Sequence, residues 1–488
     1  MRRLVTSRSG KALAALLALG VPLAAFAEPA AIVTNASGIE GRLEKATPCP
    51  GSPNWIAFQR ILDREVLHVV DTATGEIAEV SSVAPSEASR GGRGSYEGEP
   101  DWMPVPDAAG NRWLAYTGGG RVNNKDVYIT YVGAGRSWRL TNHPDLDTSP
   151  RVSPDGKRIV FVSSRSGRGD LYLIEGLDRI RTGILEGVEP VPEAAVRRLT
   201  TNEDQDIHPA FDPSGRFVAY SQWTLSAEER STEANMGIAV LDLEKPENPP
   251  VRLLLDAEQE TRPAWSPDGH RIAYYTSERI EDSQVDVGLV KVAFGEKSGS
   301  PLFGALVETG VDRRVARDVV PGETRGPSWV AGGPRGHSKA LSYVRMTEGG
   351  DRALVLADVD KWENGKVDYE SAIPVEPVQG ILDVIWGFDG TLVFSGQADR
   401  NYGIYRVPAP GDLLAEEGTF DRLIAPDSKG GGFPLWGILA GGAGLVLAGV
   451  ALLGGGGDGG GGDGFTTGDP PCPPGVDCGT PSSPRGPR

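Results

Sequence analysis

The sequence predicts an all-β fold, a β-propeller built from four-stranded blades. The first observation is an internal repeat: a similar phrase returns at intervals of roughly 50 residues between positions 54 and 425. The second is the pattern within each copy, where short stretches alternate apolar and polar residues between turns rich in Pro, Asp and Gly. Almost no helical periodicity interrupts these copies. Strand-like units with a period of this length are typical of a propeller.

Six copies of the phrase align well enough to define a common register. They cover residues 99–120, 149–174, 208–223, 262–279, 326–345 and 384–396, and a further unit at 54–80 enters the pattern part-way. Each of the six has an apolar residue at the same place in its first strand. We call this position the register mark: Trp102, Val152, Phe211, Trp265, Trp329 and Trp386.

Each copy is predicted to contain four strands. The first strand carries the register mark and ends in a turn such as 266–269, where proline presets φ and glycine supplies the positive φ that closes the hairpin. The second alternates, as at 271–275, and the third follows, as at 170–174 or 401–407. The fourth has an Arg-Leu-Thr pattern or a variant of it: 138–141, 197–200 and 420–424.

One sheet of this kind cannot bury both of its faces. Sheets stacked around a ring cover each other and leave few exposed edges, which is why the repeats favour a closed propeller. Seven blades fit if the first unit is completed by residues near 43–48, or by the far end of the chain. Six blades with an irregular start are the alternative.

The amino-terminal residues 1–27 are predicted to be a signal peptide. Arg2, Arg3, Arg8 and Lys11 precede an apolar stretch that is too short to span a bilayer, and small residues follow it. Cleavage is expected before Glu28. Residues 28–53 are then a lead-in to the propeller at 54–425.

A second hydrophobic segment, 434–453, is predicted to be a transmembrane helix after a linker at 426–433. It contains no charged residue and is long enough to cross the hydrocarbon core. Small residues spaced four apart, such as Gly437 and Gly441, could give weak self-association. A Gly-rich linker that happens to be apolar is the alternative. With a cleaved signal peptide, the propeller would face outward and the tail inward.

The remaining tail, 454–488, is rich in Gly and Pro and is expected to be disordered. Two of the three cysteines, Cys472 and Cys478, enclose a short Pro-Gly turn there. They could form a small disulfide-closed loop, or they could stay unpaired. No Cys/His spacing in the chain suggests zinc, so neither a metal nor a cofactor is expected.

The formal net charge of −17 limits the classes of partner. An acidic surface repels nucleic acid and anionic lipid, and it favours cations or basic partners. We therefore expect no nucleic-acid binding. A protein partner, if charge selects it, would be basic.

The phrase Pro-x-Trp-Ser-Pro-Asp-Gly-x-Arg-Ile-Ala-Tyr at 263–274, with the Asp-Leu-Tyr strand at 170–172 and the Arg-Leu-Thr strand, resembles the TolB-type propeller repeat. The likeness covers much of the repeat region and is most specific over 149–280. It implies a periplasmic, non-enzymatic interaction protein of the Tol–Pal envelope system. The chain departs from the family in two ways: the family's amino-terminal α/β domain is missing, and a carboxyl-terminal hydrophobic segment is added.

One polar series shares a register. Five residues before the register mark, four successive copies carry an acid, whereas the next two carry Thr324 and Ile381. Equivalent positions in successive blades lie on one face of a propeller, so these acids could form an arc at the channel mouth that holds a cation or a basic side chain. Alternatively, each acid only caps its own turn. The four acids are Glu97, Asp147, Asp206 and Glu260.

Signals for catalysis are weak. The chain has no Gly-x-Ser-x-Gly elbow, and its five histidines show no metal-binding spacing. His143 and His208 both precede a first strand, but a metal lyase would need more ligands. The sequence therefore predicts a non-enzymatic, membrane-tethered protein-interaction scaffold of the bacterial cell envelope. The alternative is a propeller enzyme, a lyase or hydrolase, that acts on carbohydrate or peptide in the central channel.

Overall fold

A computed structural model describes most of the repeat region. The described residues are 29–80, 96–121, 124–224, 235–253, 258–277, 285–294, 303–305, 314–322, 325–329, 340–387 and 390–408. The chain divides into two compact units, Met1–Ser428 and Lys429–Arg488, and all of these residues belong to the first. The predicted signal peptide 1–27, the hydrophobic segment 434–453 and the pair Cys472 and Cys478 lie outside them.

Within the described ranges, no helix has the length and apolar character needed to cross a membrane.

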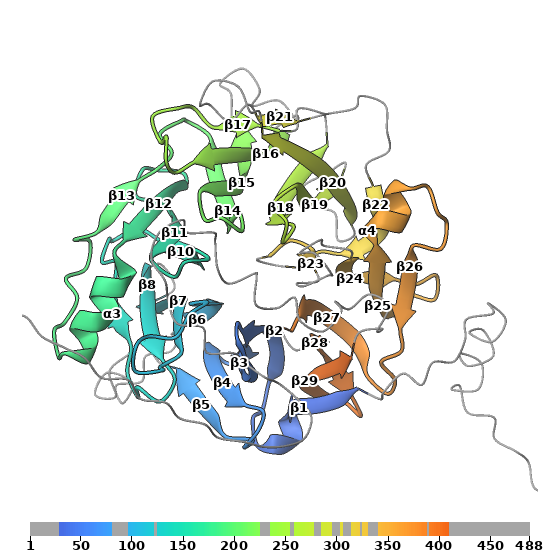
Figure 1. Ribbon diagram of the computed structural model, residues 1–488. Helices are drawn as coiled ribbons and strands as arrows, with labels where there is room; N and C mark the ends of the chain where they lie inside the picture. The colour runs from blue at the N-terminus through green and yellow to red at the C-terminus, as the bar shows by residue number, and fades with distance from the viewer. Residues whose placement is uncertain are drawn as a thin grey trace, which may run out of the picture. The chain divides into compact units, whose positions relative to one another are not determined.

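The described structure is dominated by short antiparallel strands that pair mostly with their neighbours in sequence (Figure 1). The amino-terminal strands are β1 (Ala30–Thr34), β2 (Arg42–Cys49), β3 (Ser52–Ile61), β4 (Glu65–Asp71), β5 (Ile77–Val80), β6 (Tyr96–Trp102), β7 (Trp113–Arg121), β8 (Asn124–Tyr131) and β9 (Trp138–Arg139). The middle strands are β10 (Asp147–Val152), β11 (Arg158–Ser163), β12 (Asp170–Glu175), β13 (Val196–Arg198), β14 (Gln205–Phe211), β15 (Phe217–Thr224), β16 (Asn235–Asp242) and β17 (Val251–Arg252).

The remaining strands continue the same order. They are β18 (Gln259–Trp265), β19 (Arg271–Ser277), β20 (Val285–Phe294), β21 (Phe303–Ala305), β22 (Arg314–Val320), β23 (Ser328–Trp329), β24 (Ala340–Met346), β25 (Arg352–Asp358), β26 (Glu370–Ile373), β27 (Gln379–Trp386), β28 (Thr391–Ala398) and β29 (Asn401–Pro408). The sequence-based prediction of an all-β fold made of four-stranded sheets is confirmed in this respect: β10–β13 and β14–β17, for example, each form one such sheet.

The first strand of each group lies on the inner side of the ring (Figure 1). These innermost strands contact one another in a closed order, β2 to β6, β10, β14, β18, β23, β27 and back to β2. The register marks lie near the ends of six of them. A closed ring of innermost strands is the arrangement that a propeller requires, because each sheet is then covered by a neighbour on either side.

Two strands lie in the segment 28–53, and one of them covers the residues near 43–48 that the sequence offered to complete the first unit. The segment 28–53, expected to be a lead-in, contains β1 and β2. Strand β2 pairs with β3, so it supplies the first strand that the unit at 54–80 lacked. Strand β1 pairs with β29 instead, with Ala30 opposite Arg406 and Thr34 opposite Gly403. The last sheet therefore has the order β1-β29-β28-β27, in which the amino terminus supplies the outer strand. We had expected 420–424 in that role, and those residues lie outside the described ranges.

The turn after the first strand follows the predicted chemistry. In the turn at Ser266, the Ser266 hydroxyl donates to Asp268 Oδ1 at 2.5 Å and accepts from the Arg271 amide at 2.9 Å. Gly269 has a φ of 73°, which only glycine adopts without strain. The turn at Ser153 repeats these bonds with Asp155 and Arg158. The repeated phrase therefore sets the register of each hairpin.

The Arg-Leu-Thr pattern ties the fourth strand to the third. The Thr200 hydroxyl accepts from the Leu171 amide at 3.0 Å, and Arg198 pairs with Asp170 at 2.8 Å. In the preceding sheet the Thr141 hydroxyl accepts from the Val127 amide in the same way, and Arg139 pairs with Asp126. The pattern thus has a structural role: it satisfies a buried amide and a buried carboxylate in each sheet.

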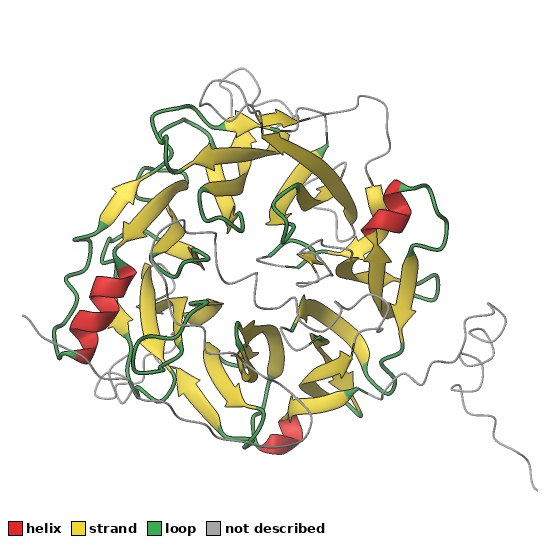
Figure 2. Ribbon diagram, viewed as in Figure 1, coloured by secondary structure: helices red, strands yellow, loops and turns green. Residues whose placement is uncertain are grey.

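The cores lie between neighbouring sheets. One cluster packs Trp113 and Ile129 against Ile159 and Tyr172 of the next sheet. Another packs β1 and β2 against β28 and β29, so that the two ends of the repeat region share one core. The helices η1 (Asn35–Ser37), α3 (Leu177–Leu185) and α4 (Val359–Glu363) lie at the outer edge (Figure 2). They are additions to the sheets, and α3 buries only one side, through Leu177, Arg181 and Ile184.

Candidate functional site

The innermost strands share a local distortion three residues before the register mark. In β2, β6, β10, β14 and β18 the pairing register shifts at this point, as expected of a β-bulge. The residue at the shift has a positive φ between 52° and 55°, a backbone conformation that residues other than glycine rarely adopt. A bulge re-aims its side chain and strains the backbone, which is common next to functional sites. The five residues are Lys45, Glu99, Ser149, His208 and Arg262.

Side chains at this bulge position connect one sheet to the next. Glu99 Oε2 accepts from the Ser149 amide at 2.8 Å, and Glu99 Oε1 accepts from the Ser149 hydroxyl at 3.1 Å. Asp383, at the equivalent place in β27, accepts from the Lys45 amide at 2.5 Å. The bond from Lys45 to Asp383 joins the first and last sheets. These acids satisfy backbone N–H groups that the bulges remove from the ladders.

A second set of bonds lies one residue before the register mark. Asp101 Oδ2 accepts from the Val152 amide at 2.7 Å, and Ser328 Oγ accepts from the Trp386 amide at 3.0 Å. The register-mark tryptophans also reach the preceding sheet: Trp102 Nε1 donates to Thr47 O at 2.8 Å and Trp329 Nε1 to Ala264 O at 2.9 Å. Trp265 and Trp386 depart from this pattern, since the buried Nε1 of each has no hydrogen-bond partner among the described residues.

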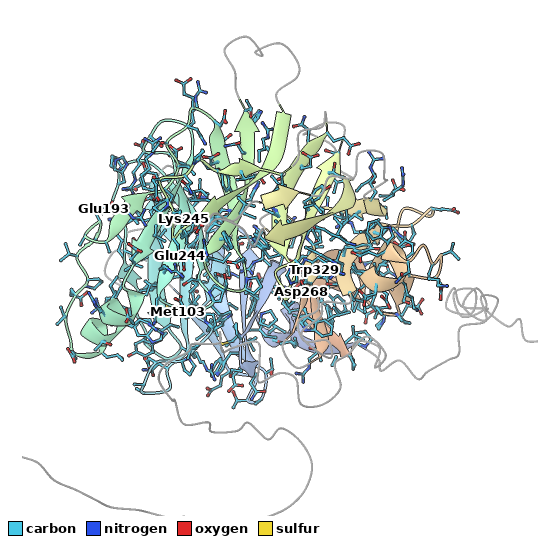
Figure 3. The ribbon with its side chains drawn as sticks, turned by 45° about the horizontal axis from the view of Figure 1, so that its top comes forward. Met103, Glu193, Glu244, Lys245, Asp268 and Trp329 are labelled. Carbon is cyan, nitrogen blue, oxygen red and sulfur yellow. The ribbon has the colours of Figure 1, made fainter. Side chains whose placement is uncertain are left out.

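A pocket of about 210 Å³ opens where four innermost strands and their turns meet. Its walls are mainly apolar and contain three register-mark tryptophans, each less than a tenth exposed. Trp329, labelled in Figure 3, lies toward the middle of the described sheets, whereas Glu193 lies near their edge. We call this site the tryptophan pocket. It is lined by Thr47, Pro48, Pro50, Asp101, Trp102, Arg325, Ser328, Trp329, Ile385 and Trp386.

An ion pair across the ring forms one side of this pocket. Arg325 precedes β23, and its Nη2 donates to Asp101 Oδ1 at 2.8 Å and to Pro100 O at 2.6 Å, both in β6. The two residues are 224 positions apart in the chain. The guanidinium carries five N–H groups, so it can still donate through Nε and Nη1. Both oxygens of Asp101, by contrast, already accept a hydrogen bond.

Buried cationic groups lie near this pair. Arg151, one residue before its register mark, is buried; burial and the nearby Arg325 lower its pKa to about 10, while Asp101 opposes this. Burial also lowers the pKa of His208 well below its ordinary value, and Arg262 and Arg151 lower it further. His208 is therefore neutral at physiological pH. The inner side of the ring combines basic and acidic groups, unlike the strongly acidic chain as a whole.

The four acids predicted from the sequence are buried at the start of their innermost strands. Asp147 pairs with Arg165 at 2.7 Å, and Asp206 accepts from Asn202 at 3.0 Å and from Gln222 at 3.3 Å. Burial raises the pKa of Asp147, and it raises the pKa of Asp206 to about 6. Glu97 and Glu260 are each only 1% exposed. Nowhere in the described part of the chain do three or more His, Cys, Asp or Glu residues group as a metal site would require.

The two histidines singled out in the sequence, His143 and His208, lie in different environments. His143 is partly exposed and lies 3.3 Å from Asp145. His208 Nδ1 lies 3.3 Å from Ser221 Oγ and 3.3 Å from Thr261 Oγ1. The Ser221 hydroxyl is fully buried and accepts from the Arg262 amide at 2.9 Å. This serine therefore holds a bulge in the next sheet and is not presented to a substrate.

Sequence reasoning did not identify Asp101, Arg151 or Arg325, and of the bulge residues it singled out only His208. A signal was present in the repeats themselves. The residue before the proline of each phrase changes from copy to copy, through Glu99, Ser149, His208 and Arg262, whereas the proline is kept. A position that varies inside an otherwise repeated phrase is one that the shared fold does not dictate.

Part of the chain is similar to a known protein family. Residues 100–293 match the family described as the TolB beta propeller domain. An uncharacterised protein of Agrobacterium fabrum is 28% identical over 153 residues, which cover 30% of this chain and 46% of that protein. The Tol-Pal system protein TolB of Bordetella pertussis is 43% identical over 53 residues, which cover 11% of this chain and 12% of that protein. The chain spans less than half the length of these curated relatives.

A solved structure agrees at the level of the fold. The puromycin-hydrolyzing peptidase of Mycobacterium tuberculosis superposes with a TM-score of 0.50 at 15% identity, and the match covers 80% of this chain and 57% of that one. A likeness at this identity concerns the fold alone. The described sheets and this likeness agree on a β-propeller fold, and residues 100–293 within it are similar to the TolB beta propeller domain.

Proposed function

We propose that this chain is an exported, membrane-tethered propeller that binds protein partners in the bacterial cell envelope and has no catalytic role of its own. The TolB-like repeats support the interaction role, because curated relatives with these repeats are named as proteins of the Tol-Pal system. The signal peptide predicted at 1–27 and the hydrophobic segment 434–453 support export and tethering. We further propose seven blades, since each innermost strand begins its own group of strands.

The observation that carries the proposal is the tryptophan pocket. It joins apolar walls to an arginine that retains N–H donors, beside a tryptophan N–H that has no partner in the described structure. Aromatic and arginine side chains in a partly closed site are typical of the centre of a protein interface. We place the binding face at the end of the ring where the β2–β3 turn lies, because Pro50 of that turn lines the pocket.

We propose a structural role for Glu97, Asp147, Asp206 and Glu260 in place of the acidic arc that the sequence suggested. Their burial supports this, since a carboxylate that is at most 1% exposed cannot reach a partner. Selection of a basic partner by the acidic surface of this chain, and weak self-association through 434–453, are parts of the proposal that rest on the sequence alone.

A matched pair of substitutions tests the proposal. Arg325→Met removes the donors at the pocket, whereas Arg345→Met removes an arginine of similar exposure that pairs with Glu370 away from the pocket. The full-length protein is immobilised in detergent, and envelope proteins retained by it are identified by mass spectrometry. We expect Arg325→Met to lose a partner that both the wild type and Arg345→Met retain. Retention by Arg325→Met, or equal loss from both variants, would contradict the proposed binding face.

A further inference from the structure

The tryptophan pocket is rich in hydrogen-bond donors and poor in acceptors. Trp386 Nε1 has no partner in the described structure, and Arg325 keeps N–H groups beyond those that bind Asp101. The acceptors near these donors are occupied: Asp101 binds Arg325 and Val152, and Thr47 O binds Trp102. A ligand that brings acceptors therefore gains most in this pocket, because the donors have spare capacity whereas these acceptors already hold hydrogen bonds.

Two of the four register-mark tryptophans, Trp265 and Trp386, have a buried Nε1 without a partner in the described structure, and of these two only Trp386 lines the pocket. Its counterparts Trp102 and Trp329 donate to a carbonyl of the preceding sheet. For Trp386 the corresponding carbonyl belongs to Ser328, and that oxygen accepts from the Ser342 hydroxyl at 3.1 Å. The indole is only 4% exposed, so its free donor is a buried polar group of the kind that a bound ligand would satisfy.

The charge of the site is balanced. The positive charge of Arg325 is neutralised by Asp101 at 2.8 Å, and the buried Arg151 has Asp101 and Glu99 nearby. A ligand carboxylate would add a negative charge, but the cations of this site, Arg325 and Arg151, already have carboxylates nearby. A neutral carbonyl oxygen, in contrast, can accept from the indole and the guanidinium without changing the charge balance.

The apolar walls point to a compact, rigid ligand body. Pro48, Pro50 and Ile385 line the pocket together with the three tryptophans. Its volume of about 210 Å³ is below the range of pockets that enclose whole ligands, roughly 300–1,000 Å³, so it can enclose only a short part of a chain. Proline residues meet these conditions, because they present apolar rings and carbonyl oxygens but have no backbone N–H.

We propose that the tryptophan pocket binds a proline-rich segment of a partner protein, which inserts one or two proline rings and places a carbonyl on Trp386 Nε1. Aromatic-lined grooves recognise polyproline II segments in this manner, and the stiffness of such a segment lowers the entropy lost on binding. This inference rests on the proposed interaction role and specifies the chemistry of the ligand.

Two register-mark tryptophans give a matched test. Trp386→Phe removes the buried, unpartnered N–H of a pocket-lining residue and keeps an aromatic ring. Trp265→Phe makes the same change at the equivalent place in β18, where Nε1 is also without a partner in the described structure but does not line the pocket. Both variants should fold, because each removes a buried donor that is not hydrogen-bonded there.

The measurement is calorimetric titration of the detergent-solubilised full chain with a decaproline peptide and with a Gly-Ser peptide of equal length. The chain's own proline residues at 469–488 are present in every sample and are a constant background. We expect saturable binding of decaproline alone, about fivefold weaker for Trp386→Phe and unchanged for Trp265→Phe.

Three outcomes would overturn the proposal: no saturable binding of decaproline, equal affinity of Trp386→Phe and wild type, or equal loss in both variants. Stronger binding of a peptide that offers only a terminal carboxylate would also overturn it. If decaproline does not bind although Arg325→Met still loses an envelope partner that the wild type retains, the proline-rich ligand is wrong while the interaction role stands.

Discussion

At the scale of single residues, Asp206 links burial to pH. Burial raises its pKa to about 6, although Asn202 and Gln222 donate hydrogen bonds to it. A carboxyl whose pKa is higher in the folded state binds its proton more tightly when folded. Its contribution to stability is therefore fully present below the unfolded pKa, near 4, and is lost as the pH rises through about 6.

Asp206→Asn should remove this pH dependence. At pH 7.5 the charged carboxylate costs the folded state about 3 kcal/mol, as the shift in pKa implies, so the variant should be more stable there by about 1–3 kcal/mol. The gain should shrink toward zero at pH 4. Guanidinium unfolding at both pH values measures it, and a gain of the same size at both would show that ionisation of Asp206 is not the cause.

Asp107 serves as a control, because its pKa is lowered in the folded protein whereas that of Asp206 is raised. Four hydrogen bonds, from the Ala109 amide, the Asn111 amide and side chain, and the Trp113 indole, lower the pKa of its carboxyl. Its stabilising effect is present above the unfolded pKa and is lost as the pH falls below it. Asp107→Asn should therefore lower stability at pH 7.5 and have less effect at low pH.

The sequence located Asp206 and its equivalents in register but could not tell which way they face. Simple alternation places residues five, three and one before the register mark on the same side of a strand. The bulge inserts an extra residue between the first of these and the last, so the acids and Asp101 do not share an environment. Glycine is the usual sequence signal for a bulge with a positive φ, and the bulges at Glu99 and His208 do not contain one at that position.

At the scale of elements, the contact between β18 and the segment that leads into β23 depends on a glycine. Gly326, at the bulge position of its copy, would place a Cβ 2.1 Å from Arg262 O and 3.1 Å from Ala264 Cβ. Backbone atoms cannot move away as a flexible side chain can. This glycine therefore allows one innermost strand to approach the next closely.

Gly326→Ala should destabilise the protein by about 1–3 kcal/mol, because the added methyl forces the two strands apart. Gly349→Ala is the control, since its Cβ would meet nothing closer than Thr347 Oγ1 at 3.8 Å, and its effect should stay below about 0.5 kcal/mol. Thermal or denaturant unfolding compares the two variants. Equal stability of Gly326→Ala and the wild type would contradict the close approach of β18 and β23.

The elements themselves were well predicted because their signals are local. The turn residues and alternating strands at 149–174 and 262–277 appear in the structure as expected. The tryptophan pocket was not predictable, because it brings together residues as distant as Thr47, Asp101, Arg325 and Trp386. Such contacts depend on how the sheets close, and no single repeat contains that information.

At the scale of the whole molecule, the ring is closed by the amino terminus. Val33 of β1 is 1% exposed and packs in one core with Phe58, Val393 and Ile404. The Lys45 amide and Asp383 add a hydrogen bond between the first and last sheets on the inner side. Closure removes the exposed edge that β29 would otherwise present to other chains.

Val33→Asp should open this closure. An uncompensated charge in the shared core should cost about 3–5 kcal/mol and expose the edge of β29, so aggregation should follow. Ala31→Asp lies in the same strand at an exposed position and should change stability by less than about 0.5 kcal/mol. Unfolding and light scattering distinguish the variants. Wild-type behaviour of Val33→Asp would show that β1 does not close the ring.

The central claim is that partners bind at the end of the ring that carries the tryptophan pocket. Because the strands are antiparallel, the β2–β3 turn at Pro50 and the β3–β4 turn at Leu62 lie at opposite ends of one sheet. Photo-reactive residues placed at each position in living cells test the claim directly. The account predicts crosslinks to an envelope protein from position 50 and none from position 62. Crosslinks from position 62 alone would contradict it.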